Sequence, residues 1–249
     1  MAKKIEIVPY NPAWPQMFEE EAAKIKQALG ENCIDVHHIG STAVPGLCAK
    51  PKIDIIAVVK DMEHVIQDLE KTGYEYRGSF NLLLHLGFRK RPPLTNVNLH
   101  VFEEGNPEIE LNLLFRDYLR AHPDALKEYE ALKLKLLSQE ASHKIIQGPF
   151  KGYTLEKDAF IKKTLDQAGF KGLCMRICTH HDEWESARTF RQKYFFDNVP
   201  IADPYTWTFD HKDHAHLVLY KGTKIIGYTH IQLWPDCRAA DQLTLNLTR

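Results

Sequence analysis

The residues most able to do chemistry lie in one stretch, a Gly-Ser turn followed by a strand that carries a single acid. Gly40 and Ser41 end a predicted strand at residues 33–39, and Asp54 lies in an apolar run at residues 53–59. Glycine permits backbone angles that a Cβ resists, and a serine hydroxyl can cap a helical turn. Amides at such a turn suit a phosphate. Because an unpaired charge among apolar residues is costly, Asp54 is expected to be paired or to hold a metal ion.

Three more side chains suit the same chemistry. His100 lies on a predicted strand at residues 97–102, on the same face as Asn98. Arg116 offers a guanidinium that clamps phosphate through paired hydrogen bonds, and Lys50 lies just before the Asp54 strand. Each candidate also has a structural explanation. Gly40 and Ser41 would then form an ordinary turn, His100 would be a hydrogen-bonded structural histidine, and Arg116 would form a helix-surface ion pair.

Asp54 has the same two explanations. It either binds a metal ion or forms an ion pair with a nearby base, and the bases that we consider are Lys50, Lys52, Arg89 and Arg116.

Alternating helix and strand patterns are expected to position these residues, which predicts an α/β (α+β) fold of a sheet with flanking helices. The predicted strands are residues 33–39, 53–59, 74–77, 82–89 and 97–102, and residues 5–8 are a short strand or an extended arm. The predicted helices are residues 15–29, 62–71, a long segment from 115 that breaks near His122-Pro123, and 155–167. Residues 108–113 fit either a helix or a strand, and Gly148-Pro149 is a predicted loop.

Composition limits the classes of partner. The chain has 249 residues, of which 44% are hydrophobic and 26% charged, and a net charge of -1. That charge creates no global field for nucleic acid or an anionic membrane. The first ten residues lack an apolar signal segment, and no run approaches a membrane span. Five cysteines without framework spacing fit a reducing, cytoplasmic location, and the Cys174–Cys178 spacing alone makes a poor zinc site.

Several motifs together resemble the GrpB family (UPF0157) of the nucleotidyltransferase superfamily, over about residues 5–168. The matching segments are residues 8–14, 38–47, 50–55, 99–101 and 115–123, with Tyr153, Lys157 and Phe160 in the last helix. The resemblance implies a twisted mixed sheet with a Gly-Ser turn that binds nucleotide phosphates and two or three acids that bind a divalent metal such as Mg²⁺. It implies nucleotidyl transfer from a nucleoside triphosphate to a small molecule, RNA or protein hydroxyl.

The sequence departs from the active pattern of that superfamily in its acids. The same-face neighbour of Asp54 on its strand is Ile56, and the next strand offers Asn98 and His100. Glu108 or Glu110 would have to complete a metal site, although nothing in the sequence requires it. A module that kept the fold and binds a nucleotide, another small phosphorylated ligand or a partner without catalysis is therefore the alternative hypothesis.

The composition changes near residue 170, which predicts two domains, 1–170 and 174–249. The second segment resembles the front half of a GNAT acetyltransferase, with a strand at 174–179, a helix at 181–194 and a hairpin around Lys221-Gly222-Thr223. It lacks the later Gly-rich loop for the acetyl-CoA pyrophosphate. We therefore expect no acetyl transfer by this chain, although an intact form of the segment would acetylate a small molecule or protein.

Two further features of this second segment carry expectations. Its apolar strand edges are expected to pair with the first domain or with a second chain as a homodimer. His211, His214 and His216 match no metal-ligand spacing, and we expect solvated histidines there.

Overall fold

Two neighbouring strands form the centre of the first sheet, and the first of them is apolar except for one acid. In the computed structural model of the chain, β2 (Ile53–Val59) and β5 (Val97–Glu103) run parallel, with Asp54 in register with Asn98. Continuous apolar runs are typical of strands that are covered on both faces. The structure describes residues 6–79, 82–93, 95–139, 145–147, 150–151, 156–178, 181–197, 199, 201–209 and 211–232.

Three antiparallel strands complete this sheet. They are β1 (Cys33–Ile39) beside β2, and β4 (His85–Lys90) and β3 (Glu75–Gly78) on the far side of β5. The order is β1-β2-β5-β4-β3, so the sheet is mixed. The predicted α/β fold with a mixed sheet and flanking helices is confirmed.

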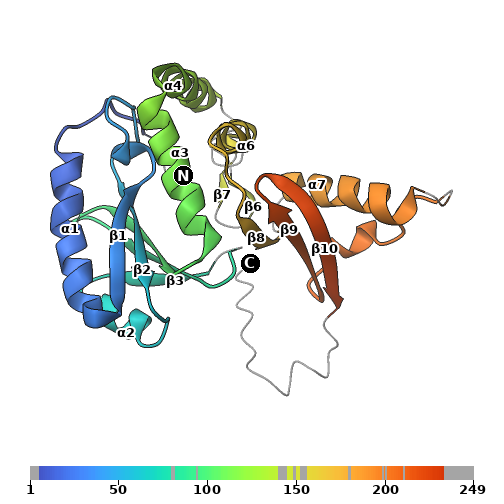
Figure 1. Cartoon of the computed structure of the whole chain (residues 1–249), viewed down its shortest axis with the longest axis horizontal. Coiled ribbons are helices and arrows are strands. Elements are labelled where there is room, and N and C mark those ends of the chain that lie inside the picture. The colour runs from blue at the N-terminus through green and yellow to red at the C-terminus, as the bar shows by residue number, and fades with distance from the viewer. Residues whose placement is uncertain are drawn as a thin grey trace.

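Helix α1 (Trp14–Leu29) covers one face of the sheet because its apolar residues recur with helical spacing. Phe18, Ile25 and Leu29 are buried in one cluster with the alternate residues of β2 and β5. The short helix α2 (Val65–Glu70) adds Val65 and Leu69 to the same core. Figure 1 shows both helices on the same side of the molecule.

Helix α3 (Pro107–Ala121) packs against the opposite face. Its Ile109 and Leu113 join Ile39 and Ile56 in a second cluster. The segment 108–113, for which the sequence left helix and strand open, is helical, and the Asn106 side chain accepts from the Glu108 amide at its start, at 3.0 Å.

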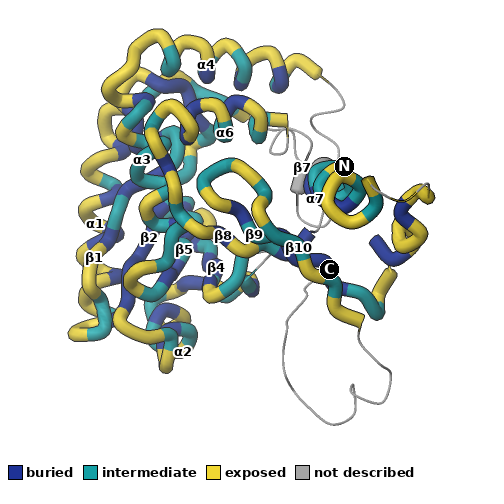
Figure 2. Tube along the Cα trace, turned by 45° about the vertical axis from the view of Figure 1, so that its right-hand side comes forward, coloured by how far each residue is buried: buried dark blue, intermediate teal, exposed yellow. Residues whose placement is uncertain are grey.

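Two more helices follow α3 and complete this layer. They are α4 (Pro123–Ser138) and α6 (Asp158–Gln167), and in Figure 2 the buried residues of α4 face the body of the protein. The predicted break at His122-Pro123 is the junction of α3 and α4.

The C-terminal segment forms a separate three-stranded antiparallel sheet, ordered β10-β9-β8. Its elements are β8 (Leu173–Ile177), α7 (His181–Arg191), a π-helical turn (Gln192–Phe196), β9 (His214–Lys221) and β10 (Lys224–Gln232). A small hairpin of β6 (Ile145–Gln147) and β7 (Phe150–Lys151) precedes α6. The strand, helix and hairpin order predicted for this segment is present, whereas residues 233–249 lie outside the described part.

This second sheet packs directly on the first part of the chain. Cys174, Val218 and Tyr220 share a hydrophobic cluster with Leu165 of α6, and Phe115 of α3 borders it. An isolated β-bridge joins Leu82 to Arg176. The domain boundary near residue 170 stays a prediction, and the two parts share packed side chains across it.

Several predicted boundaries were wrong for local backbone reasons. Helix α2 begins at Val65 rather than 62, because His64 has a left-handed φ of 61°. Strand β4 begins at His85 rather than 82, after Leu84 with a φ of 51°. Among the described residues 6–8 of the predicted short strand or extended arm, Val8 forms a bridge with Ala49. Helix α6 begins at Asp158, and the predicted loop Gly148-Pro149 lies outside the described residues.

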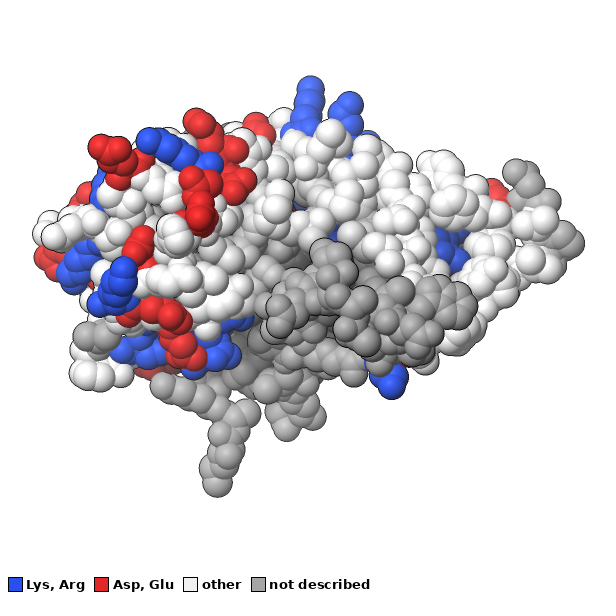
Figure 3. All heavy atoms as spheres, turned by 90° about the horizontal axis from the view of Figure 1, so that it is seen from below, with Lys and Arg blue, Asp and Glu red and all other residues white. Residues whose placement is uncertain are grey.

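Charged side chains are unevenly spread over the surface. Figure 3 shows basic and acidic residues mixed at the end of the molecule that holds α1, and mostly uncharged residues toward the opposite end. Such interspersed charge accords with the net charge of -1. Among the residues that the structure describes, no helix has the length and apolar character needed to cross a membrane.

Candidate phosphate-binding site

The Gly-Ser turn lies directly against the carboxylate of Asp54. Gly40 has φ 70° and ψ -169°, a conformation that is essentially restricted to glycine. A Cβ at this position would lie 2.9 Å from Asp54 Oδ2, which is closer than real Cβ contacts. Ser41 then begins a 3₁₀ turn that ends at Ala43. The sequence therefore needs a glycine here for two reasons, the backbone conformation and the close approach to Asp54.

Two arginines one helical turn apart on α3 hold the ends of this turn. Arg116 Nη1 donates to the carbonyl oxygen of His38 at 2.9 Å, and Arg120 Nη2 donates to that of Ala43 at 2.6 Å. Arg116 also donates from Nε and Nη2 to the Asp117 carboxylate, at 2.8 and 2.9 Å. These hydrogen bonds to Arg116 hold the pKa of Asp117 below its usual range. Arg116 is thus engaged as an ion pair that positions the turn.

Helix α4 supports the turn from another side. Burial raises the pKa of the Tyr129 phenol, and a hydrogen bond between Tyr129 and Ser41 acts in the opposite direction. One turn later, the buried Lys133 ammonium donates to the carbonyl oxygen of Cys48, and Glu130 accepts from the Cys48 amide at 3.1 Å. The segment between the turn and β2 is therefore fixed to α4 by charged hydrogen bonds.

A cluster of lysines surrounds Asp54. Burial, then the charges of Lys50 and Lys133, lower the pKa of Lys157 to about 7, against the attraction of Asp54. Burial likewise lowers the pKa of Lys133 to about 8. Lys52 Nζ lies 3.6 Å from Asp54 Oδ1. The four lysines Lys50, Lys52, Lys133 and Lys157 outnumber the carboxylates of Asp54 and Glu130 that act on them, so the local charge is positive and suits a polyanion.

Asp54 is an ion-paired and hydrogen-bonded acid in this structure. Its Oδ1 accepts from Asn98 Nδ2 at 3.0 Å and pairs with Lys52, while its Oδ2 faces Gly40. Of the bases considered as partners, Lys52 is confirmed, whereas Arg89 pairs with Glu75 instead, at 2.7 Å.

The donor set around Asp54 does not fit a divalent cation held by the protein. Within the described ranges, no three His, Cys, Asp or Glu side chains gather as a metal-binding group. Magnesium prefers several oxygen ligands in octahedral geometry, and Asp54 alone supplies a carboxylate that already has two polar partners.

His100 is held in one tautomer by a second histidine. The carbonyl oxygen of Ser79 can only accept, so His85 donates to it from Nδ1, at 3.0 Å. Burial lowers the pKa of His85 to about 3, so the ring is neutral and its Nε2 accepts from His100 Nδ1 at 2.9 Å. Burial also lowers the pKa of His100. The neutral His100 ring therefore keeps a lone pair on Nε2, which suits a proton acceptor.

The predicted site residues thus fall into two groups. Gly40, Ser41 and Asp54 lie together where β1 ends and β2 begins, and His100 lies on the next strand of the same face. Lys50 belongs to this group through its charge, which acts on Lys157 together with that of Asp54. Arg116 contacts the same turn from its backbone side. Sequence reasoning missed the contributions of Arg120, Tyr129, Lys133 and His85, and it quoted Lys157 only as a family match. Tyr153, quoted with it, lies outside the described residues.

The C-terminal histidines pack away from this turn. His216 is buried, hydrogen-bonds to the Tyr228 hydroxyl and stacks on Phe209 at 4.5 Å, and burial lowers its pKa to about 4. His214 Nδ1 lies 2.7 Å from His230 Nε2. The expectation that these histidines are solvated is therefore wrong for His216, because it fills the space between the hairpin and α7.

Comparisons with known proteins match the first two thirds of the chain. The UPF0157 protein YqkA of Bacillus subtilis is 39% identical over 171 residues, which cover 67% of this chain and 48% of YqkA. The chain thus spans about half the length of that relative. The glutamate-rich protein GrpB of Alkalihalophilus pseudofirmus is 30% identical over 66% of this chain and 95% of its own length. None of these matches supports the predicted acetyltransferase resemblance of residues 174–249.

A solved structure agrees with the sequence matches. The crystal structure of the conserved protein GrpB from Enterococcus faecalis is 41% identical, with a TM-score of 0.58, over 66% of this chain and 96% of that one. The profile of the GrpB protein family matches residues 4–167, which include the Gly-Ser turn, Asp54, His100 and the helices that position them. The chain therefore belongs to the GrpB family.

Proposed function

We propose that this chain binds the phosphates of a nucleoside triphosphate at the Gly-Ser turn and transfers the nucleotidyl group to a hydroxyl. The observation that carries the proposal is the lysine cluster around Asp54, in which Lys133 and Lys157 have lowered pKa values. Bound phosphates would compensate this charge and would favour the charged ammonium forms. The lysines and the turn then neutralise the charge that builds on the phosphate oxygens during transfer.

The proposed step balances as follows. The acceptor hydroxyl oxygen attacks the α-phosphorus and forms a new P–O bond, while the bond to the pyrophosphate breaks and the pyrophosphate leaves. The hydroxyl proton passes to His100 Nε2, whose lone pair the His85 contact keeps available. Because the donors around Asp54 do not fit Mg²⁺, we route no part of the step through a metal ion.

Titration calorimetry with each nucleoside triphosphate and with inorganic triphosphate tests binding. We expect binding that persists in EDTA and weakens by about tenfold or more in Lys157→Met and Lys133→Met, since each removes one charge from the site. Lys60→Met, a change at an exposed lysine, is the matched control and should bind like the parent. Failure of every triphosphate to bind would overturn the proposal.

A second candidate function is nucleotide binding without catalysis. It is favoured by the buried Ile56, which occupies the neighbouring position to Asp54 on that face of the strand and supplies no carboxylate. Incubation with a triphosphate labelled in the α-phosphate separates the two. Loss of label transfer in His100→Phe, with nucleotide binding retained, would support catalysis. Tight binding with no transfer to any hydroxyl compound would support the binding module.

A further inference from the structure

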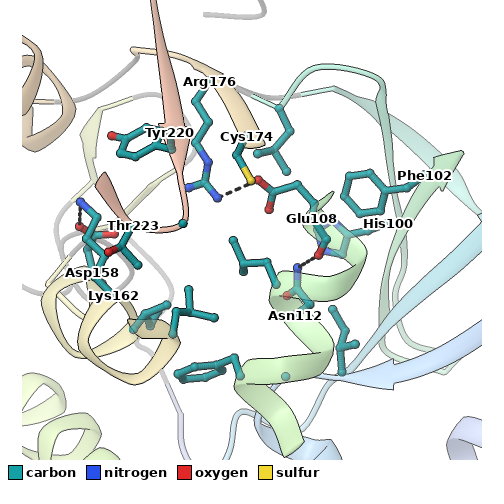
Figure 4. Close-up of a pocket in the computed structure, with 18 of the residues that line it drawn as sticks. His100, Phe102, Glu108, Asn112, Asp158, Lys162, Cys174, Arg176, Tyr220 and Thr223 are labelled. Atoms are coloured by element: carbon teal, nitrogen blue, oxygen red, sulfur yellow. Dashed lines mark hydrogen bonds and ion pairs between the residues drawn. The ribbon is translucent and has the colours of Figure 1, made fainter. Parts of the chain in front are cut away.

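A cavity of about 390 Å³ lies between the GrpB-family part and the C-terminal sheet. Gly40, which follows β1, and His100 and Phe102 of β5 lie around its floor, and α3 and α6 supply further walls. Cys174, Arg176, Tyr220 and Thr223 close it from the C-terminal side, and Figure 4 shows Arg176 and Cys174 facing Glu108 of α3. A volume of this size is typical of sites for small molecules.

Both cations of the cavity wall pair with neighbouring acids, and the buried Glu183 adds a third carboxylate to the lining. Arg176 Nη2 donates to Glu108 Oε1 at 2.8 Å, and Lys162 pairs with Asp158 at 2.7 Å. Arg176 and Lys162 are the cationic side chains among the described lining residues. Burial raises the pKa of the Cys174 thiol to about 12. An anionic ligand would therefore find no uncompensated cation among the described lining residues.

Two polar atoms on opposite walls offer a ligand one hydrogen-bond donor and one acceptor. Arg176 Nε is buried and unpaired, and it can only donate. His100 Nε2 has a lone pair, because Nδ1 is used by His85, and it can accept. The rest of the wall is largely apolar. The apolar lining side chains are Ile39, Leu82, Phe102, Leu111, Phe115, Ile161, Leu165 and Tyr220.

We propose that this cavity binds a small, uncharged, mostly apolar molecule with a hydroxyl group, and that this molecule is the acceptor of the nucleotidyl group. The hydroxyl donates to His100 Nε2, and a second oxygen accepts from Arg176 Nε. The role of this molecule as the acceptor rests on the proposed function, whereas its chemical class rests on the lining of the cavity alone. The cavity adjoins the phosphate site, since Gly40 and His100 lie at both.

The C-terminal segment then sets the acceptor specificity. Its hairpin is seated against the end of α6, where Gly222 donates its amide to the carbonyl oxygen of Gly172 at 2.8 Å. Thr223 Oγ1 donates to Asp166 at 2.6 Å. A Cβ at Gly222 would lie 2.7 Å from the carbonyl oxygen of Phe170, so this turn cannot accept a side chain without moving the cavity wall.

Saturation-transfer NMR with three probes of one shape tests the ligand class on the full chain. We expect benzyl alcohol to bind more tightly than toluene, and benzoate to bind least. Leu111→Trp, which fills the cavity, should weaken benzyl alcohol by about tenfold or more. Leu134→Trp, at a leucine 51% exposed on α4, is the matched control and should leave it unchanged. His100→Phe should remove the preference for the alcohol over toluene.

The outcomes separate this inference from the proposed function. Benzyl alcohol binding that Leu111→Trp leaves unchanged, or tightest binding of benzoate, would overturn the inference even where triphosphates bind. Absence of triphosphate binding together with the expected probe pattern would overturn the transfer step and leave the cavity as a site for a neutral alcohol.

Discussion

Gly40 and Asp54 are in closer contact than any pair of residues with side chains at both positions would allow. The Gly40 backbone lies so near the carboxylate that an added Cβ would be 2.9 Å from Asp54 Oδ2 and 3.1 Å from its Cβ. The turn that offers backbone amides and the strand that offers the acid are therefore one packed unit. A ligand at the turn would bind beside Asp54 and the lysines that compensate it.

Gly40→Ala should lower the free energy of unfolding by about 3 kcal/mol, because backbone strain adds to the overlap with Asp54. Gly46→Ala is the matched control. Gly46 also has a positive φ, of 82°, but a Cβ there meets nothing within 4 Å. Urea denaturation of both variants measures the difference. Equal losses of stability would show that Asp54 does not restrict this position.

Arg120→Met should loosen the turn, because it removes both hydrogen bonds to the Ala43 carbonyl oxygen. Hydrogen bonds from a charged donor contribute about 1.5–3 kcal/mol, so we expect a loss in this range and weaker triphosphate binding. Arg77→Met removes a guanidinium that pairs with Glu75 at the surface, and it should change both quantities little. Calorimetry on the two variants checks this, and equal triphosphate affinities would contradict it.

Anion binding should weaken as the pH rises from 6 to 9, because Lys157 has a pKa of about 7 and Lys133 of about 8. Sulfate is a suitable probe, since its charge is constant over this range. A bound anion raises the lysine pKa values, so binding takes up protons and affinity falls once the free lysines deprotonate. We expect a loss of about tenfold by calorimetry. Lys157→Met should flatten the profile, and an unchanged slope in this variant would refute the assignment.

Lys157 also predicts how the stability of the fold changes with pH, and the change has the opposite sign to that caused by a salt-bridged lysine. Its folded pKa of about 7 is below the ordinary value of 10.5. Between these two values the unfolded chain holds a proton that the folded chain has lost, so stability rises with pH in this window. Thermal unfolding across this range should show a smaller rise in Lys157→Met than in the parent chain.

The sheet and the turn could be predicted because their sequence signals are local. The apolar run with one acid gave β2, and the helical spacing of Phe18, Ile25 and Leu29 gave the buried face of α1. The resemblance to the GrpB family rested on the same motifs and is confirmed. Four bases were considered as ion-pair partners of Asp54, and one of them, Lys52, forms the pair.

The supporting residues were not predictable because they come from distant helices. Arg120 contacts a carbonyl oxygen 77 positions away, and Lys133 contacts one 85 positions away. One signal was available for Lys133, which follows Tyr129 by four residues and precedes Leu136 by three. It thus lies within an apolar helical stripe, where a lysine needs a buried partner. The cavity depends on how the C-terminal sheet packs on α3 and α6, which no local pattern specifies.

The tautomer assigned to His100 can be measured directly. Long-range proton–nitrogen correlation spectra should show His100 with a protonated Nδ1 and a bare Nε2, because His85 Nε2 accepts at 2.9 Å. His85→Phe removes this acceptor and should allow the other tautomer. His122, an exposed histidine on a different helix end, serves as the internal reference in both spectra. A protonated Nε2 on His100 in the parent chain would rule out its assignment as the proton acceptor.

The buried ion pair between α1 and β4 should be sensitive to the loss of one partner. Lys90 pairs with Glu21, and Tyr74 donates to the same carboxylate at 2.9 Å. Burial opposes ionisation of Glu21, but the hydrogen bond and charge of Lys90 hold the pKa of this carboxyl below its usual value. Lys90→Met should therefore cost about 3 kcal/mol in urea denaturation, because the buried Glu21 carboxylate then keeps only the exposed Lys24, at 3.3 Å, as a charged partner.

The double variant Glu21→Leu with Lys90→Met supplies the control for this pair. Replacing both charges with apolar groups removes the desolvation cost of each, so the double variant should be more stable than Lys90→Met alone. The recovery will be incomplete, because Tyr74 is only 3% exposed and its hydroxyl then loses its acceptor. A double variant less stable than Lys90→Met would show that the carboxylate stabilises the core through Tyr74 rather than through Lys90.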